Sequence, residues 1–245
     1  MTAAERYFEL LVEHLAQVRS SQAAALARAA EAIADRLAAG GTLWTVGCGH
    51  SALLAQEVYY RAGGLMLVNF LPLPGTLLHE RPAPMTSRLE KLPGLAERVL
   101  QESPVKPGDA MIVISTSGRN AAPVEAALVA RERGVLVVGV TSGAYAGAPS
   151  GHPSGKSLAE AADLVLDTLV PVGDAALELP GLAERTGPLS GAVGAALMQA
   201  LMVQVLESLL ARGITPPVFE SGNVPGGPEH NQRLFAQYAD RLHYL

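Results

Sequence analysis

Short apolar runs and longer helix-like segments alternate along this chain of 245 residues. The apolar runs are continuous and rich in β-branched side chains, which is typical of strands buried on both faces. They predict strands at 42–47, 65–70, 110–115, 135–140 and 163–167. Because strands that alternate with helices form parallel sheets covered on both faces, we expect an α/β fold, a three-layer αβα sandwich around a five-stranded parallel sheet.

The two ends of the chain differ in pattern from its middle. Residues 3–39 are alanine-rich, and their apolar positions fall on the stripes of a long helix. Neither an internal repeat nor a linker-like segment interrupts the sequence, so we expect a single domain over residues 1–245. Its expected parts are an N-terminal helical region, an αβα core and a C-terminal segment, at 1–40, 41–212 and 213–245.

Two connections are too long to be simple turns. Residues 71–93 and 141–157 are rich in proline, glycine and serine, and each follows a predicted strand. Long connections inside a compact domain are usually functional, and α/β sheets bind ligands at the carboxyl ends of their strands. We therefore expect both loops to contribute to a ligand site.

A glycine-rich loop over residues 47–51 (Gly-Cys-Gly-His-Ser) joins the first predicted strand to a helix expected from Ala52. Free N–H groups and the helix dipole make such a strand, tight loop and helix start an anion site. The glycines let the backbone turn sharply and approach a ligand, and Ser51 adds a hydroxyl donor. The loop therefore predicts a phosphate site.

The same loop also fits a looser fingerprint of dinucleotide-binding folds, Gly47-x-Gly49-x-x-Ala52. A dinucleotide site would need an acidic residue about 20 positions further on, where it would hold the ribose. No aspartate or glutamate occurs between Arg61 and His79. This makes a nucleotide the less favoured ligand, and we expect no cofactor.

A second polar loop follows the third predicted strand. Its sequence, Ser-Thr-Ser-Gly-Arg-Asn over residues 115–120, precedes a helix-like segment from Ala121 to Arg133. A single serine-rich helix start is common as a cap and would not identify a ligand. Two such loops, both after buried strands, indicate that they converge on one anion.

Together the two loops resemble a known family. Gly47-x-Gly49-x-Ser51-x-x-x-Ala55 and Ser115-x-Ser117-Gly118-x-Asn120 are similar to the paired phosphosugar loops of the SIS (sugar isomerase) domain, from about residue 44 to 210. Motifs at 78–80, 87–94, 152–156 and 221–231 resemble an uncharacterised bacterial branch of that superfamily, described as phosphosugar or phosphoheptose isomerases. The resemblance implies a Rossmann-like fold, a phosphorylated sugar as ligand, and assembly into a homodimer or homotetramer.

The resemblance also implies which residues bind the phosphate or the sugar. They are Gly47, Gly49, His50, Ser51, Ser115, Thr116, Ser117 and Asn120. An isomerase further needs a base that moves a proton between adjacent carbons, usually a carboxylate, and a group that opens the sugar ring, often a histidine.

Glu57 is the first candidate for the catalytic base. The run Ala55-Gln56-Glu57-Val58-x-x-Arg61 is similar to one in sedoheptulose 7-phosphate isomerases, in which the second glutamate is catalytic. The alternative interpretation is an ion pair between Glu57 and Arg61, which are four residues apart on a helix surface. The sequence leaves both interpretations open.

Glu80 and His230 are the other candidate catalytic residues. Glu80 lies beside His79 in the first long loop, where it either swings over a ligand or belongs to the solvated surface. In SIS enzymes a C-terminal segment, often from a neighbouring subunit, brings a histidine over the sugar. His230 fits that role as a ring-opening group or general acid, but it equally fits a helix start after Gly226-Gly227-Pro228.

The start of the last core helix departs from the usual SIS isomerase pattern. A glutamate is expected there, but residues 187–194 contain no carboxylate. Two alternatives to an isomerase therefore stay open. One is a non-catalytic phosphosugar-binding sensor, and the other is a phosphosugar lyase of the muramic acid phosphate etherase type.

Composition limits the partners and the cellular compartment that we expect for this protein. With 17% charged residues and a net charge of −5, the chain has no basic footprint for nucleic acid. The single cysteine, Cys48, excludes an intrachain disulfide, fits a reducing cytoplasm, and is interpreted as a small filler of the loop. Polar residues interrupt the apolar stretch 192–211, which predicts a buried helix and no membrane contact.

A metal site would require several ligands from distant segments. His79, Glu80, His152 and His230 are the candidates, but no close-spaced pair such as His-x-x-x-His occurs. We therefore expect no metal. The other histidines, apart from His50 in the glycine loop, fit ordinary helix positions, at His14 and His243.

Overall fold

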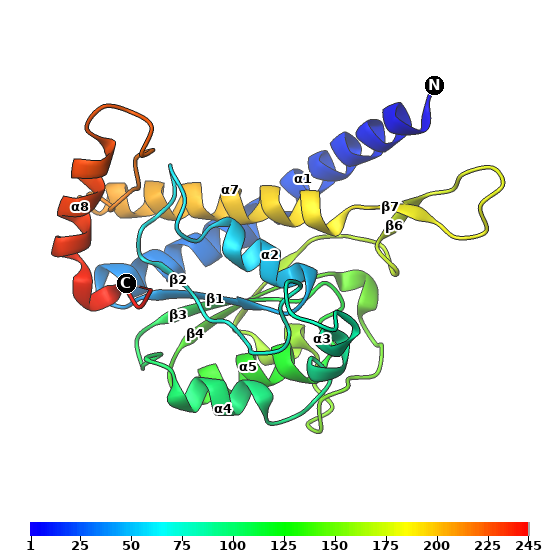
Figure 1. Ribbon diagram of the computed structural model, residues 1–245, viewed down its shortest axis with the longest axis horizontal. Coiled ribbons are helices and arrows are strands. Elements are labelled where there is room, and N and C mark those ends of the chain that lie inside the picture. Colours follow the sequence, from blue (N-terminus) through cyan, green and yellow to red (C-terminus); the bar gives the residue numbers. More distant parts are fainter. Residues whose placement is uncertain (245) are drawn as a thin grey trace.

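The computed structural model describes residues 1–244 and has one central sheet with helices on both of its faces (Figure 1). The five strands are parallel and lie in the order β2-β1-β3-β4-β5. They are β1 (Leu43–Gly47), β2 (Val68–Phe70), β3 (Ala110–Ile114), β4 (Leu136–Thr141) and β5 (Leu164–Asp167). The predicted α/β fold with a five-stranded parallel sheet is confirmed.

Alternate residues of the central strand enter two separate hydrophobic cores. Ile112 and Ile114 face one core, and Met111 and Val113 face the other. Helices α1 (Ala3–Ala38), α2 (His50–Glu57) and α7 (Ser190–Ala211) cover the first core, whereas α4 (Leu95–Glu102), α5 (Ala121–Glu132) and α6 (Leu158–Ala161) cover the second. Because both faces of the strands are buried, the strands read as continuous apolar runs in the sequence.

Shorter helices and a β-hairpin lie in the connections and in the C-terminal segment, outside the central sheet. The two long connections contain α3 (Pro84–Leu89) and the 3₁₀ turn η1 (Gly143–Tyr145), and the C-terminal segment contains α8 (Gly227–Gln237) and η2 (Ala239–Arg241). A hairpin of β6 (Ala175–Leu177) and β7 (Thr186–Pro188) precedes α7. This hairpin and the N-terminal half of α1 extend beyond the sheet at one end of the molecule, and α8 lies at the opposite end (Figure 1).

Several boundaries differ from the sequence-based expectations. The helix expected from Ala52 begins at His50, and β2 covers three residues because the chain before it pairs elsewhere. Leu65 forms an antiparallel bridge with Val218, so the C-terminal segment takes the place of a longer β2 pairing.

The expectation that His243 occupies a helix position is wrong. It lies in a turn after η2, where its ring stacks on Trp44 with the ring centroids 5.1 Å apart. The Asn69 side-chain oxygen accepts a hydrogen bond from the His243 N–H at 2.7 Å, which ties the end of the chain to β2.

Helix α7 packs along α1 as a core helix. Within residues 1–244 it is the one helix long and apolar enough to cross a membrane, and half of its most apolar window is buried inside the fold. Its outward side retains exposed apolar residues, including Val203 at 64% exposure.

Candidate functional site

The strand order places the two polar loops next to each other. In an order of 2-1-3-4-5 the chain leaves β1 toward one edge of the sheet and leaves β3 toward the other, which opens a crevice between these strands at their carboxyl ends. Gly47, the last residue of β1, is paired with Ile114, the last residue of β3. The 47–51 and 115–120 loops therefore start side by side at the position where α/β sheets bind ligands.

The first loop is tightly closed. A Cβ atom at Gly47 would lie 2.6 Å from the main-chain oxygen of Ser51, so no larger residue fits there. Gly49 has φ +54 and donates its N–H to the carbonyl oxygen of Thr76 at 2.8 Å. The N–H of Ser51 also has an acceptor, the carbonyl oxygen of Cys48 at 3.0 Å. The N–H groups of Gly49 and Ser51, which we expected to be free for an anion, are thus paired within the protein.

The second loop leaves more donors free. Its Thr116, Ser117, Arg119 and Asn120 N–H groups find no acceptor among residues 1–244. The Asn120 side chain makes no capping hydrogen bond, although Asn120 is the residue that precedes α5. The dipole of the 12-residue α5 adds positive potential at this point. The 115–120 loop therefore offers more free N–H donors than the 47–51 loop does.

Contacts with the end of β4 fix the shape of this second loop. Gly118 has φ +61, and a Cβ atom there would lie 2.5 Å from the Thr141 hydroxyl oxygen. The carbonyl oxygen of Thr116 accepts a hydrogen bond from the Ser142 N–H at 3.0 Å. Ser115 is buried, and its hydroxyl oxygen accepts a hydrogen bond from the Gly118 N–H at 3.2 Å. Ser115 thus stabilises the loop from within.

Cys48 belongs to the first loop, but its side chain is buried and the residue is only 5% exposed. Burial, followed by the negative charge of Glu90, raises the pKa of its thiol to about 12. A thiol with this pKa is protonated at neutral pH and is a poor nucleophile. The structure thus supports the interpretation of Cys48 as a small residue that fills the loop.

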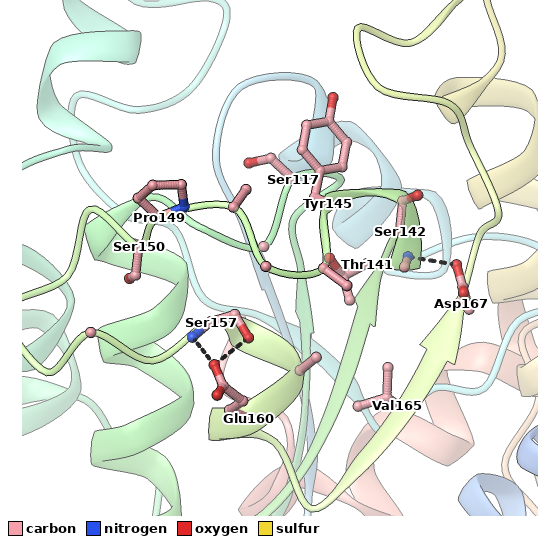
Figure 2. A pocket seen from close by; sticks show the side chains of 17 residues that line it. Ser117, Thr141, Ser142, Tyr145, Pro149, Ser150, Ser157, Glu160, Val165 and Asp167 are labelled. Atoms are coloured by element: carbon pink, nitrogen blue, oxygen red, sulfur yellow. Dashed lines mark hydrogen bonds between the residues drawn. The ribbon is translucent and has the colours of Figure 1, made fainter.

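A cavity of about 550 Å³ lies on the β4 and β5 side of the second loop (Figure 2). Of the residues that we expected to bind phosphate or sugar, Ser117 is the one that lines it. Ser142 and Tyr145 come from the loop after β4, which we expected to be functional, whereas Asp167 at the end of β5 was missed. No local pattern marks Asp167, because its hydrogen-bond partner Gly143 is 24 positions away in the sequence.

Glu57 lies at the far end of α2 from the glycine loop. Its carboxylate pairs with the Arg61 guanidinium and accepts a hydrogen bond from the Gln199 side chain of α7 at 3.2 Å. Glu57 is seven positions after His50, which corresponds to a rise of about 10 Å along the helix. The geometry thus contains the ion pair that was the alternative interpretation of this residue.

Glu80 and His230 are also engaged within the chain. Glu80 accepts a hydrogen bond from the Gly75 N–H at 2.9 Å and so braces its own loop. A ring nitrogen of His230 lies 3.0 Å from the carbonyl oxygen of Val218, which bridges to Leu65 just before β2. Because β2 is parallel to β1, His230 lies at the amino edge of the sheet, whereas the 47–51 and 115–120 loops lie at the carboxyl edge.

The four candidate metal ligands do not converge. Within residues 1–244 no group of three or more histidine, cysteine, aspartate or glutamate side chains is arranged to hold a metal ion. His152 instead lies with its ring nitrogen 3.9 Å from the carboxylate of Glu125.

A carboxylate does lie at the start of α7, although the sequence places none there. Asp174 accepts hydrogen bonds from the N–H and the hydroxyl of Ser190, at 2.7 and 2.5 Å. Leu54 in the middle of α2 contacts Gly194, one turn into α7, so this end of α7 packs against α2. Sequence reasoning missed Asp174 because it is 16 residues from Ser190 and no local pattern links them.

Comparison with known proteins agrees with this architecture. The SIS domain family model matches residues 6–142. A UPF0309 protein of Streptomyces griseus is 45% identical over 243 residues, which cover 98% of this chain and 97% of that protein. Another from Geobacillus kaustophilus is 38% identical over 241 residues, which cover 98% and 96%. The structure of a phosphoheptose isomerase from Francisella tularensis has a TM-score of 0.55 and 18% identity, covering 84% of this chain and 98% of that one. Since the family model matches more than half of the sequence, the chain belongs to the SIS domain family.

Proposed function

We propose that this protein binds a phosphorylated sugar in the crevice between β1 and β3 and interconverts its aldose and ketose forms. The observation that carries the proposal is the set of N–H groups without acceptors at Thr116, Ser117, Arg119 and Asn120. Successive free N–H groups in a loop, together with a helix N-terminus, are the usual protein partners of phosphate. Phosphoheptose isomerases from Francisella tularensis and Neisseria gonorrhoeae share the fold, which supports a phosphorylated sugar as the ligand.

In this proposal the two loops have different tasks. The 115–120 loop holds the phosphate through its free N–H groups and the side chains of Thr116, Ser117 and Asn120, with Ser115 shaping the loop. The glycine loop brings the Ser51 hydroxyl and the exposed His50 to the other side of the crevice. Gly47 and Gly49 allow the backbone to close without side chains in the ligand's space.

The chemical step needs a base between two sugar carbons. It removes a proton from the carbon next to the carbonyl and returns it to the former carbonyl carbon, while a proton moves between the two oxygens. Glu57 is our candidate because it lies on the helix that leaves the first phosphate loop. Its carboxylate lies beside the Arg61 guanidinium, which holds the side chain in place. His230 would open the sugar ring bound to a second copy of the chain, since the 47–51 and 115–120 loops of its own chain lie at the opposite edge of the sheet.

A binding and exchange experiment tests the proposal. Melting temperatures are measured with aldose 5-, 6- and 7-phosphates, with the free sugars and with inorganic phosphate, because ligands of the folded state raise the melting temperature. The sugar phosphate that stabilises most is then incubated in D₂O, and deuterium at its first two carbons is followed by NMR. We expect a selective shift and deuterium incorporation. No sugar phosphate exceeding inorganic phosphate would overturn the proposal.

Variants separate binding from chemistry. Glu57→Gln should retain the shift in melting temperature and lose deuterium incorporation, whereas loss of binding as well would contradict its role as the base. Glu132→Gln is the matched control, because Glu132 is exposed on α5 and makes no ion pair within residues 1–244.

A non-catalytic sensor is the second candidate function. The observation that favours it is the engagement of Glu57 by both Arg61 and Gln199, which leaves this carboxylate already paired. Selective sugar phosphate binding without deuterium incorporation, under any of the ligands that bind, would establish the sensor and exclude the isomerase.

A further inference from the structure

The segment after β4 fixes two peptide units of the 115–120 loop. The Gly118 carbonyl oxygen accepts a hydrogen bond from the Leu158 N–H, and the Arg119 carbonyl oxygen accepts one from the Gly151 N–H, both at 2.7 Å. In a planar trans peptide the N–H points away from the C=O of the same unit. These two contacts therefore aim the N–H groups of Arg119 and Asn120, which have no acceptor among residues 1–244, away from this segment.

The turn over residues 150–157, which carries Gly151, is closed by hydrogen bonds of its own. The Ser150 hydroxyl donates to the Lys156 carbonyl oxygen at 2.7 Å and accepts a hydrogen bond from the His152 N–H at 3.0 Å. Because these bonds tie both ends of the turn together, it behaves as one unit. Whatever holds His152 in place therefore also holds Gly151 against the phosphate loop.

The His152 ring faces a carboxylate. Its Nδ1 accepts a hydrogen bond from the Ser154 N–H at 3.1 Å, so the neutral ring carries its proton on Nε2. Nε2 lies 3.9 Å from Oε1 of Glu125, which is an electrostatic contact longer than a hydrogen bond. The two side chains are only 13% and 7% exposed, so water screens this contact little.

Glu125 is a firm anchor for the ring. It lies one turn into α5, the helix that begins directly after the phosphate loop. Its Oε1 accepts one hydrogen bond, from the Gly94 N–H at 2.6 Å, and its Oε2 accepts those of Ala96 and Glu97. Three N–H donors thus fix the carboxylate, and Oε1 keeps room for a further donor.

We propose that His152 is a positioning residue for phosphate binding, which holds the 150–157 turn on Glu125 so that Gly151 keeps the Asn120 N–H aimed at the ligand. The inference rests on the proposed function, in which this N–H is a phosphate donor. Without the ring, the turn keeps its own hydrogen bonds but loses its tie to α5, so the peptide unit before Asn120 is free to rotate. Hydrogen bonds weaken steeply as they depart from linear geometry, so the phosphate is held less tightly.

Binding of inorganic phosphate reports on the donor geometry. Dissociation constants are measured by calorimetry for inorganic phosphate and for the sugar phosphate that raises the melting temperature most. His152→Ala should weaken both about tenfold, the effect of one misaligned hydrogen bond to a charged ligand. In the deuterium assay the same variant should raise KM by this factor and leave kcat within about twofold of the wild type, because the ring does not touch the reacting carbons.

Two conservative variants separate the contact with Glu125 from the polarity of the side chain. His152→Gln places an amide N–H near the position of Nε2, so it should restore the affinity for phosphate to within about twofold of the wild type. His152→Asn carries the same amide group closer to the main chain, too far from Glu125 to donate to it. It should therefore bind phosphate as weakly as His152→Ala.

His14→Ala is the matched control for a histidine with a purely structural role. His14 on α1 is also partly buried, and a ring nitrogen lies 2.9 Å from the Thr168 carbonyl oxygen. We expect His14→Ala and His152→Ala each to lower the melting temperature of the ligand-free protein by about 2–4 °C, since Glu125 keeps its three N–H donors in both. Only His152→Ala should lose phosphate affinity, and only in it should hydrogen exchange be faster in the peptide that contains Gly151.

The outcomes distinguish this inference from the proposed function. If a sugar phosphate binds the wild type selectively and binds His152→Ala equally well, the positioning role is overturned and the proposed function stands. Equal weakening by His152→Gln and His152→Asn would also overturn it, because the contact with Glu125 would then not be the cause. If no sugar phosphate exceeds inorganic phosphate but His152→Ala still weakens inorganic phosphate, the proposed function fails and the positioning role stands. If the wild type binds neither, both fail.

Discussion

The N–H of Gly49 donates a hydrogen bond to the carbonyl oxygen of Thr76, with 2.8 Å between nitrogen and oxygen. This contact joins the glycine loop after β1 to the long loop after β2, although Thr76 is 27 positions after Gly49 in the sequence. The Thr76 side chain also lies near the Cys48 thiol, where it partly opposes the rise in pKa that burial causes. The 47–51 loop is therefore closed by a residue from another strand connection, and its thiol is buried.

The buried position of Cys48 predicts that its thiol reacts slowly with alkylating reagents. Its pKa of about 12 leaves almost no thiolate at pH 8, and only thiolate reacts quickly with iodoacetamide. We expect negligible labelling of the native protein by mass spectrometry over a period in which the protein unfolded in guanidinium chloride is fully labelled. Rapid stoichiometric labelling in the native state would contradict the buried loop geometry.

Gly47 predicts a steric limit on the same loop. In Gly47→Ala the new Cβ would lie 2.6 Å from the Ser51 oxygen and 3.0 Å from the Ala52 nitrogen, so the start of α2 must shift. We expect a loss of about 1–3 kcal/mol of stability in urea unfolding, together with weaker stabilisation by sugar phosphates. Gly222→Ala is the control, since nothing lies within 4 Å of a Cβ at that exposed position. Equal behaviour of the two variants would show that the loop tolerates a side chain.

The strands and the positions of the two polar loops after β1 and β3 could be predicted because their signals are local. Ala110 to Ile114 is a continuous apolar run whose residues are all buried, so its composition reports its environment directly. The glycines and serines that follow each strand are likewise contiguous in the sequence. For the same reason the error at β2 was confined to its first residues, where Leu65 pairs with Val218 from the distant C-terminal segment.

The rest of the site depends on contacts between distant segments. Asp167 meets Gly143 across 24 residues, and Asp174 caps α7 across 16. Neither aspartate stands in a pattern that marks it, because the backbone groups it bonds to carry no sequence signal. His230 is the opposite case. A sequence motif indicated it as a site residue, but within one chain the fold places it away from the 47–51 and 115–120 loops.

Glu125 predicts a large effect on stability outside the crevice. This buried carboxylate on α5 accepts hydrogen bonds from the N–H groups of Gly94, Ala96 and Glu97 at 2.6, 2.9 and 3.1 Å, and so caps α4. Glu125→Ala leaves these donors without an acceptor and should reduce the free energy of unfolding by about 2–3 kcal/mol. Glu125→Gln keeps one acceptor oxygen, so its free energy of unfolding should lie between those of the wild type and Glu125→Ala.

Urea unfolding of each protein checks this prediction. Glu132→Ala on the same helix is the control, because that side chain is exposed and should leave the unfolding midpoint nearly unchanged. A Glu125→Ala variant as stable as the wild type would mean that solvent replaces the carboxylate at this helix start.

Glu31 predicts part of the acid sensitivity of the packing between α1 and α7. The Ser208 hydroxyl and then the Arg212 guanidinium lower the pKa of the Glu31 carboxyl. The unfolded chain therefore takes up the proton first as the pH falls, so the stabilisation is fully present above the ordinary value of about 4.3 and is lost as the pH drops through the lower folded value.

Thermal unfolding between about pH 6 and pH 3 measures this contribution. Glu31→Gln should lower the melting temperature at pH 6 and flatten its decline toward pH 3. Glu13→Gln, on an exposed position of the same helix, should follow the wild-type curve. A Glu31→Gln curve parallel to that of the wild type would exclude the contribution.

Finally, the distance between His230 and the phosphate loops predicts that the complete site needs two copies of the chain. Phe8 and Val12 on α1 are each 65% exposed and Val203 on α7 is 64% exposed, so the outer faces of these helices offer apolar surface to a partner. We expect a dimer or tetramer in sedimentation experiments, and Val203→Glu should weaken it. Val172→Glu, at an equally exposed valine in the loop after β5, is the matched control and should leave assembly intact.

Mixing variants decides whether the copies share a site. Ser117→Ala removes a phosphate ligand from one half of a shared site, and His230→Asn removes the ring-opening group from the other, so each variant alone should lose most of its turnover. Random pairing in a mixture makes half of the dimers mixed, and each mixed dimer contains one intact site of two, so about a quarter of the sites recover. Recovery should fail when both variants also carry Val203→Glu. If the mixture stays as inactive as its components while the dimers exchange, His230 does not serve the partner's phosphate loops.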